Sequence, residues 1–541
     1  METTPLAWLI GLPLAAGPVV YLAGRLRLQI ADSRLQIGKL PIPHLQSLIP
    51  RPAWLALAVL AASGAALALT ARELAAGQAQ TLALGMVVLR FDGLSLLVAA
   101  LALAMATLVV LFCGPDLAGR IGEEKLYALV VMLAGALTGL ACAADLFNLW
   151  VWFELVAIAS YLVVGFDGRR PAALEAGVKY LAQGAAGSTL VLLGIALVLA
   201  QSGTLGLDQI RARAAWSPAL LAAGALFVVG FGVKAALVPL HTWLPDAYAQ
   251  APSGVSALLS AIVTKAGIVA LLRALSALAG ARVTWGALLL GFGALNIVAG
   301  NLLALRQTQL KRLLAYSSLG QIGYILLGLG VGVYAGQAAG AQGGLFHVLT
   351  HGLMSGLAFL AAGALIYATK DEGPRTKDQG PRIEGAVSSL VVRRSSETQD
   401  APEGDITIED LAGAAGRYPL AALALGVAAL GLAGLPPLAG FMSKWQIFVA
   451  GAATRDAVIV GLIGFAALNT VVSLAYYAPL VNVLYRVTPS AAVQCGRPLP
   501  IAIQAPLAAL ALAVLLLGAW PNLAAWLTEP AARVVVAMFG G

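Results

Sequence analysis

The sequence predicts an all-α polytopic membrane protein of about fourteen transmembrane helices. Of its 541 residues, 60% are hydrophobic and only 11% are charged, whereas a soluble globular chain carries roughly 25% charged residues. The apolar residues fall in long blocks, many of them at least the roughly 18 residues that a helix needs to cross about 30 Å of hydrocarbon. A soluble chain of this length would instead divide into several domains with charged surfaces.

Apolar runs between charged residues or Pro/Gly-rich turns define the expected spans. The first run, in METTPLAWLIGLPLAAG, has no basic segment ahead of it, so we expect a retained helix and no cleaved signal peptide. The expected spans are 6–23, 53–70, 91–113, 124–143, 145–166, 177–201, 219–239, 254–277, 284–305, 313–331, 342–367, 418–450, 456–485 and 502–527.

The Lys and Arg residues between these spans predict the orientation. If the N-terminus lies outside, most of the 33 basic residues fall in inner loops, and fewer, Arg273 and Arg282 among them, fall in outer segments. Cytoplasmic loops are the ones that carry an excess of Lys and Arg. We therefore expect a protein of the cell inner membrane with both termini on the outer, periplasmic side.

Residues 368–417 form the one long polar segment, which is rich in Pro, Gly, Ser and charge. Such a composition does not bury a core, so we expect a largely flexible cytoplasmic loop. The loop is either a tolerated insertion, which its composition favours, or a docking site for a partner.

The three cysteines give no sign of a disulfide framework or of an Fe–S or zinc ligand set. Cys113, Cys142 and Cys495 are far apart and form no CxxC pair. We expect them to pack as small apolar residues, and we expect no bound cofactor or metal.

A few ionisable residues interrupt the apolar spans. Charge at mid-bilayer costs about 2.5–3.5 kcal/mol even on insertion scales, so such residues are functional candidates. Glu154 and Lys265 lie near the centres of their spans, far from the headgroups. Lys179 lies near a span end, where its long side chain can reach the interface.

Lys234 and Lys444 each lie beside a proline in an apolar span. Lys234 is followed by Pro239 and His241, and Lys444 is preceded by the pair Pro436–Pro437. Proline removes a helical hydrogen bond, and a break at this depth is tolerated only where the freed groups face protein or water. Two interrupted helices in corresponding positions of two halves indicate a transporter built from repeats.

His347 and His351 are four residues apart and share one face of a helix. A zinc site is disfavoured because Val348 stands where the HExxH motif has its glutamate. Packed core histidines are an alternative, but a proton relay is favoured because histidine titrates near neutral pH. His241 is a further, weaker candidate for the relay.

Five segments together resemble the proton-antiporter family of membrane subunits found in respiratory complex I, membrane-bound hydrogenases and Mrp-type cation/proton antiporters. The resemblance covers residues ~90–485. The segments are DLFNLWVWFELVAIASYL, GVKAALVPLHTWLPDAYAQAPSGVSALLSAIVTKAGI, LKRLLAYSSLGQIGY, HVLTHGLMSGLAF and GLPPLAGFMSKW.

The resemblance implies two inverted five-helix repeats with flanking helices. Its key glutamate falls on Glu154, its broken-helix lysine on Lys234, its linking lysine on Lys265 and its exit lysine on Lys444. The expected division of the chain is 1–113 for N-terminal flanking helices, 114–277 and 278–485 for the two repeats, and 486–541 for a C-terminal flanking helix.

The chain also departs from the family pattern, because Ser355 stands where the family usually has a lysine after the paired histidines. No long amphipathic helix is expected after the last span, as in the shorter complex I subunits and the Mrp D subunit. Family members work inside multisubunit complexes, so the resemblance implies other membrane subunits as partners, within a lipid bilayer and without nucleic acid.

Three functions remain open from the sequence. The favoured one is an ion-translocating subunit, for protons or Na⁺, of a redox-driven complex related to NADH:quinone oxidoreductase or a hydrogenase. The alternatives are a D-type subunit of a Mrp-type antiporter, and the coupling subunit of a solute-uptake system. In the expected relay, a lysine in a dry site holds its proton weakly and a nearby carboxylate restores its hold, with protons passing through Glu154, Lys234, Lys265, His351 and Lys444. The sequence shows no nucleophile, phosphate loop or redox ligand set for catalysis by this chain alone.

Overall fold

A computed structural model gives the fold of most of the chain. The structure describes residues 4–32, 51–78, 80–85, 87–117, 122–168, 170–213, 217–369 and 406–540.

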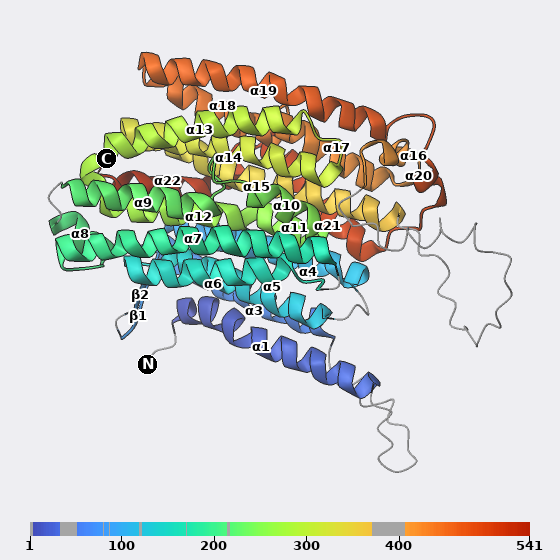
Figure 1. Ribbon diagram of the computed structural model, residues 1–541, viewed down its shortest axis with the longest axis horizontal. Helices are drawn as coiled ribbons and strands as arrows, with labels where there is room; N and C mark the ends of the chain where they lie inside the picture. Colours follow the sequence, from blue (N-terminus) through green and yellow to red (C-terminus); the bar gives the residue numbers. More distant parts are fainter. Residues whose placement is uncertain are drawn as a thin grey trace, which may run out of the picture.

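Long helices run side by side through the molecule (Figure 1). The first half contains α1 (Pro5–Asp32), α3 (Pro52–Ala75), α4 (Gly93–Leu117), α5 (Glu123–Cys142), α6 (Leu146–Val164), α7 (Pro171–Ser202), α8 (Leu207–Arg213), α9 (Pro218–Lys234), α10 (Trp243–Gln250), α11 (Ser253–Leu258) and α12 (Thr264–Ala277). The second half contains α13 (Arg282–Ala304), α14 (Leu310–Ala335), α15 (Ala338–Thr369), α16 (Ala414–Arg417), α17 (Pro419–Ala433), α18 (Ala439–Ala453), α19 (Ala457–Leu484), α20 (Ala491–Cys495), α21 (Ile501–Ala519) and α22 (Ala525–Met538).

The predicted class, an all-α polytopic membrane protein, is confirmed. By length and composition, 12 helices of the described chain can cross a membrane, and α9 and α17 are shorter apolar helices. The number of about fourteen spans stays a prediction, because α9 and α17 each complete a crossing only together with the helix after the break. Figure 1 shows that α1 begins and α22 ends toward the same end of the bundle.

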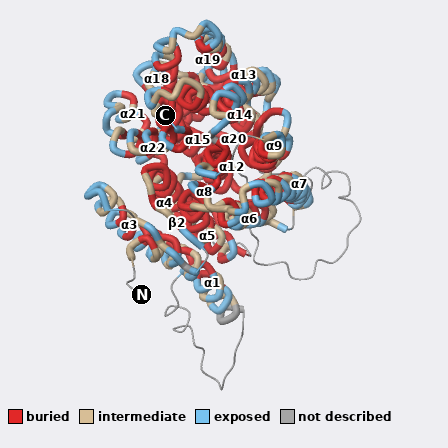
Figure 2. Tube along the Cα trace, turned by 90° about the vertical axis from the view of Figure 1, so that its left-hand side faces the viewer, coloured by how far each residue is buried: buried red, intermediate tan, exposed pale blue. Residues whose placement is uncertain are grey.

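The centre of the bundle is formed by α4, α5, α12 and α15. Figure 2 shows these helices mostly buried, whereas α1, α3, α7 and α19 expose one face each at the periphery. In the apolar stretch of α15, 94% of the residues are buried, and in that of α11 and α12 all of them are buried. Helices that are enclosed on all sides and still carry Lys265, His347 and His351 hold these side chains away from lipid.

A β-hairpin precedes α4, where the sequence predicted only helices. β1 (Gln80–Leu84) pairs antiparallel with β2 (Val87–Phe91), with Leu82 opposite Leu89. Gly85 turns the chain with φ of +63°, which glycine adopts at no steric cost. The hairpin was missed because its short apolar run merges into the span that follows.

Both ends of the polar segment 368–417 belong to the packed structure. Residues 370–405 lie outside the described residues, but α15 continues to Thr369 and residues 406–417 pack onto the bundle. Thr407 pairs with Gln309, and Leu411 and Ala414 are fully buried. The prediction of a flexible loop is therefore wrong for 406–417, where short apolar anchors outweigh the polar composition.

The span 418–450 is divided into α17 and α18 at the predicted Pro436–Pro437 break. The expected span 502–527 ends earlier, with α21 at Ala519. The region 486–541 therefore holds α20, α21 and α22 and not one flanking helix. α22 packs closely on the start of α4, since a Cβ on Gly93 would lie 2.4 Å from the Pro530 carbonyl carbon.

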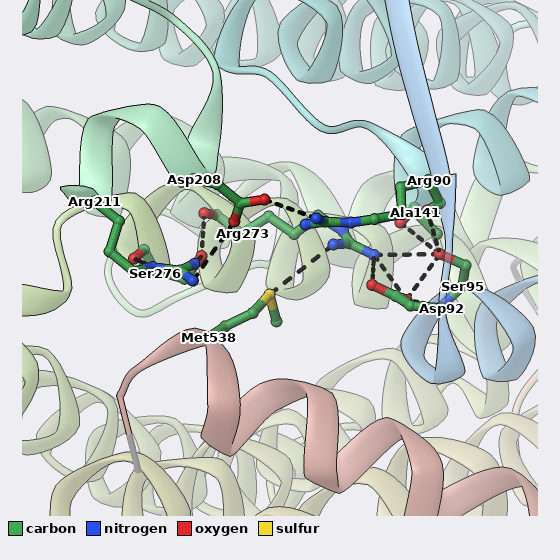
Figure 3. Close-up of polar contacts among 9 residues, drawn as sticks. All are labelled: Arg90, Asp92, Ser95, Ala141, Asp208, Arg211, Arg273, Ser276 and Met538. Carbon is green, nitrogen blue, oxygen red and sulfur yellow. Dashed lines mark hydrogen bonds and ion pairs between the residues drawn. The ribbon is translucent and has the colours of Figure 1, made fainter. Parts of the chain in front are cut away.

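Arg273 was assigned to an outer segment, but the structure buries it in α12. Its Nη2 donates to both carboxylate oxygens of Asp92, at 3.0 and 2.9 Å, and to the hydroxyl of Ser95. Figure 3 shows this cluster joining the start of α4, the end of α12 and Met538 of α22. The charge was misassigned because its partner lies 181 residues earlier in the chain.

Candidate functional site

The first interrupted helix is α9, which ends at Lys234, and residues 235–242 separate it from α10, which begins at Trp243. Asn296 of α13 satisfies two backbone groups of the break. Its Nδ2 donates to the Ala236 carbonyl at 3.0 Å, and its Oδ1 accepts from the Val238 N–H at 2.9 Å. The break is thus filled by protein, as irregular backbone at membrane depth requires.

Lys234 lies in a pocket of hydroxyl groups and aromatic rings. Its Nζ donates to Tyr180 at 2.7 Å and to Ser160 at 3.1 Å, and lies 4.7 Å from the centre of the Tyr180 ring. Tyr180 stacks on Trp243 at 3.8 Å, and Trp243 donates to the Val233 carbonyl. The helix after the break therefore fixes the ring that holds the lysine before it.

Glu154 does not form an ion pair with Lys234. Its side chain is half-buried on α6, on the same face as Val151 and Ile158, which are 43% and 48% exposed. Its Oε1 is buried and has no hydrogen-bond partner among the described residues. The carboxylate thus lies on a partly exposed face of α6, and no ion pair between described residues joins it to the lysine.

Lys179 and His241, also in the first half of the chain, are both at least partly exposed. The Lys179 side chain is 48% exposed and pairs with Glu175 at 2.8 Å and with Asp246 at 3.0 Å. These two partners account for its charge, as expected for a lysine near a span end. His241 is half-buried beside the break, and its Nδ1 has no described partner.

Lys265 lies just after a π-helical turn, Leu259–Val263, that separates α11 from α12. Such turns are rare and often occur at functional sites. The Nζ of Lys265 donates to the Ser260 carbonyl, which the wider turn exposes. A Cβ on Gly267 would lie 2.5 Å from the Ala235 nitrogen, so α12 packs directly against the break that follows Lys234, and Lys265 lies two residues earlier on the same helix.

The second interrupted helix holds Lys444 at the start of α18. The Nζ of Lys444 donates to the Leu432 carbonyl of α17 at 2.9 Å and lies 4.4 Å from the centre of the Tyr324 ring. Both halves thus place one lysine against an interrupted helix and an aromatic ring. No described carboxylate forms an ion pair with Lys234, Lys265 or Lys444.

His347 is hydrogen-bonded toward the second break. Its Nδ1 is 2.8 Å from the Ser443 hydroxyl, and its Nε2 is 3.1 Å from the Gln321 side-chain oxygen. Gln321 in turn donates to the Leu432 carbonyl at 3.0 Å, the same oxygen that Lys444 contacts. A continuous polar line therefore joins His347 to Lys444.

His351 lies one turn from His347, with ring centres 6.1 Å apart. Both of its ring nitrogens are buried and have no hydrogen-bond partner among the described residues. α15 approaches the π-turn here, since a Cβ on Gly352 would lie 3.0 Å from the Ala261 carbonyl oxygen. His351 thus stands between the Lys265 region and the polar line, but no hydrogen bond between described residues closes that gap.

Ser355 does not extend this line. It is buried on α15, and its hydroxyl lies 3.5 Å from the Gly352 carbonyl of its own helix. The second half instead makes its polar link through Gln321 and Ser443. The described residues contain no group of three or more His, Cys, Asp or Glu side chains that could hold a metal ion.

The neutral members of the site do not stand out in the sequence. Charged residues and histidines are conspicuous in apolar spans, whereas the structure adds neutral hydroxyl, amide and ring groups that contact them or the break beside Lys234. Their signal in the sequence is a polar residue inside an apolar span, which is weak because serine and threonine often bond their own helix. The added residues are Ser160, Tyr180, Asn296, Gln321, Tyr324 and Ser443.

Comparison with known proteins agrees with this architecture. The family described as NADH:quinone oxidoreductase/Mrp antiporter, TM matches residues 143–379 and 385–470. The F(420)H(2) dehydrogenase subunit N of Methanosarcina mazei is 34% identical over 425 residues, which are 76% of this chain and 78% of the relative. The NADH-quinone oxidoreductase subunit N 2 of Roseiflexus castenholzii is 35% identical over 448 residues, 80% of this chain and 82% of the relative.

Among solved structures, a chain of respiratory complex I from Thermus thermophilus superposes with a TM-score of 0.71. It is 28% identical and covers 95% of this chain and 98% of its own length. The residues matched by the family include both interrupted helices and every candidate of the relay. The chain belongs to the NADH:quinone oxidoreductase/Mrp antiporter transmembrane family and is a membrane subunit of the complex I-like or Mrp-type complexes.

Proposed function

We propose that this chain is a proton-translocating subunit of a redox-driven complex of the NADH:quinone oxidoreductase type, in the cell inner membrane. Two relatives named subunit N, one of an NADH-quinone oxidoreductase and one of an F(420)H(2) dehydrogenase, favour the redox-driven complex. The catalytic redox chemistry belongs to partner subunits, and this chain supplies the proton path.

The observation that carries the proposal is the row of buried groups along the middle of the bundle. Lys234, Lys265 and Lys444 are each buried without a carboxylate partner among the described residues, and His347 and His351 lie between the last two. Charge inside a membrane is costly, so three such lysines are retained for function and not for stability.

The relay works by changing how strongly each lysine holds its proton. Lys234 rests on neutral hydroxyls, so a shift of the Glu154 charge changes the electrostatic field at its Nζ without breaking an ion pair. A proton that leaves Lys234 passes to Lys265 and then to the histidines. It reaches Lys444 through water held by the polar line of Gln321 and Ser443 and by the carbonyls of the second break. Of the two repeats, 114–277 supplies one interrupted helix with Lys234 and also Lys265, and 278–485 supplies the other interrupted helix with Lys444.

The test replaces each lysine by Ala and then by Arg in the assembled complex, with proton pumping measured in proteoliposomes. Arginine keeps the charge but hardly releases its proton, so a site that must exchange protons fails with both replacements. We expect pumping to fall at least tenfold with Ala or Arg at Lys234, Lys265 or Lys444.

Lys179 is the matched control, because its charge is already paired at the surface. We expect Lys179→Arg to pump at the normal rate. Full pumping with Lys234→Arg or Lys265→Arg would show that these charges only shape a field, and the relay would have to be abandoned.

The alternative function is that of a D-type subunit in a Mrp-type cation/proton antiporter, since the matching family includes those antiporters. The subunits that purify with this chain distinguish the two. Fe–S and quinone-site subunits support the redox-driven complex, and a set of small antiporter subunits supports the alternative.

A further inference from the structure

A second row of polar residues runs from Tyr324 of α14, beside Lys444, along the contact between α13 and α19. It contains Tyr476, Asn301, Asn469, Thr470 and Tyr324, of which all but the half-buried Thr470 are buried, and we call it the α19 row. All five are neutral. Buried polar groups in a membrane protein are costly and usually functional.

The α19 row begins at Lys444. The ring of Tyr324 lies 4.4 Å from the Nζ of Lys444, and its hydroxyl lies 2.8 Å from that of Thr470 and 2.9 Å from the Ala466 carbonyl. Asn469, the neighbour of Thr470, accepts from the Nδ2 of Asn301 at 2.9 Å through its carbonyl oxygen. The row thus leads from the lysine to the C-terminal part of α13.

The row continues toward the end of the bundle where α13 and α19 end. The Tyr476 hydroxyl donates to Asn301 Oδ1 at 2.9 Å. Tyr477 stands beside it, with ring centres 4.5 Å apart. The Tyr477 hydroxyl is buried and has no hydrogen-bond partner among the described residues. A buried hydroxyl without a partner, next to a row of amides and hydroxyls, is a place for bound water.

A cavity of about 600 Å³ opens near the end of this row. Ala478, Pro479 and Asn482 of α19 line it on one side, and Gln307 and Thr308, after α13, line it on the other. Val483, which lies two turns after Tyr476 on the same face of α19, also lines the cavity. Arg486 also lines the cavity, which places its mouth at the end that the positive-inside rule assigns to the cytoplasm.

We propose that the α19 row is a hydrated branch that carries protons between Lys444 and the cavity at the ends of α13 and α19. The inference rests on the proposed function, because it assigns Lys444 a second connection besides the one through His347. A proton that arrives through water beside Tyr476 converts the neutral amine of Lys444 to an ammonium. Asn301 and Asn469 act by holding the water and do not themselves change protonation.

The first test measures water along the row by hydroxyl-radical footprinting of the intact complex. Radicals form from water, so tyrosines next to bound water are oxidised. We expect Tyr476 and Tyr477 to be oxidised at least fivefold faster than Tyr127, which is equally enclosed in α5. We also expect Asn469→Leu to remove most of that difference. Equal protection of Tyr476, Tyr477 and Tyr127 would overturn the proposal.

The second test measures pumping as a function of pH in Tyr476→Phe and Asn469→Leu. A branch that supplies protons becomes limiting when protons are scarce, so we expect a loss of about fivefold at high pH that diminishes at low pH. Tyr127→Phe and Thr138→Val, which remove buried hydroxyls elsewhere, are the matched controls and should pump normally. A loss that is equal at every pH indicates a structural role and contradicts the branch.

The two proposals fail in different ways. If Lys444→Ala pumps normally, the relay itself is wrong. If Lys444→Ala stops pumping while Tyr476→Phe and Asn469→Leu pump normally at every pH, the relay stands and only the branch along α19 is rejected.

Discussion

The buried lysines of this chain are held by neutral groups, and this determines how they respond to charge. Lys234 donates to two hydroxyls, and Lys265 and Lys444 each donate to a backbone carbonyl. A carboxylate in contact would fix the ammonium form, whereas hydroxyls and carbonyls give a weaker preference for it. A neutral setting therefore leaves each lysine sensitive to a charge placed several ångströms away.

Glu154→Gln tests this sensitivity at the residue scale. The change removes the charge and keeps the shape, so we expect the complex to assemble normally and proton pumping to fall at least tenfold. Assembly is measured by native gel electrophoresis, and pumping by the quench of a pH-sensitive dye in proteoliposomes.

Val151→Ala, on the same exposed face of α6, is the control for a change at that surface. If Glu154→Gln assembles and pumps like the unchanged protein, the carboxylate has no part in switching Lys234. The absence of an ion pair between Glu154 and Lys234 would then mean that the charge of Glu154 does not act on Lys234, even at a distance.

At the scale of elements, a side chain from another helix forms hydrogen bonds with backbone groups at each interrupted helix. Asn296 of α13 pairs with both the Ala236 carbonyl and the Val238 N–H, and Gln321 of α14 donates to the Leu432 carbonyl. Helices of the second half thus satisfy the backbone in both breaks. The local geometry beside Lys234 therefore depends on residues that lie far along the chain.

Asn296→Leu should destabilise the first break. It leaves a buried carbonyl and a buried N–H without partners, each at a cost of about 1–3 kcal/mol. We expect a lower midpoint of thermal unfolding for the purified complex and slower pumping. Asn148→Leu is the control, because it removes a longer contact of 3.3 Å to one backbone carbonyl. Equal midpoints for the two variants would contradict this role of Asn296.

The sequence predicted the interrupted helices but not what fills them. Proline and a nearby lysine are visible in a linear pattern, so the breaks beside Pro239 and Pro436 were found. Asn296 and Gln321 look like ordinary polar residues in the sequence, because their partners lie 60 and 111 positions away along the chain and only the fold brings them together. Likewise, the hairpin at 80–91 and the packed segment 406–417 depend on tertiary contacts that outweigh local composition.

At the scale of the whole molecule, Arg273 and Asp92 connect α4 and the C-terminal helix α22 to the central helix α12. Asp92 directly precedes α4 and accepts from the Ser95 N–H at 2.9 Å. Arg273 belongs to the same helix as Lys265, and Met538 of α22 contacts the guanidinium. The nearby Arg90–Asp208 pair is exposed. The Arg90 guanidinium, through its hydrogen bond, holds the pKa of the Asp208 carboxyl below its usual value. Figure 3 shows the two pairs close together.

The buried and the exposed pair should respond very differently to the loss of one partner. Arg273→Met leaves the Asp92 charge buried without its partner, which costs about 3–5 kcal/mol. Arg90→Met removes a surface pair that is worth at most about 1 kcal/mol. We therefore expect a large fall in the thermal midpoint of the complex for Arg273→Met and almost none for Arg90→Met. The double variant Arg273→Met with Asp92→Asn removes both charges and keeps an acceptor for the Ser95 N–H, so it should recover most of the loss. If the double variant is no more stable than Arg273→Met alone, the destabilisation comes from lost packing against α22. The ion pair is then not what joins α4 and α22 to α12.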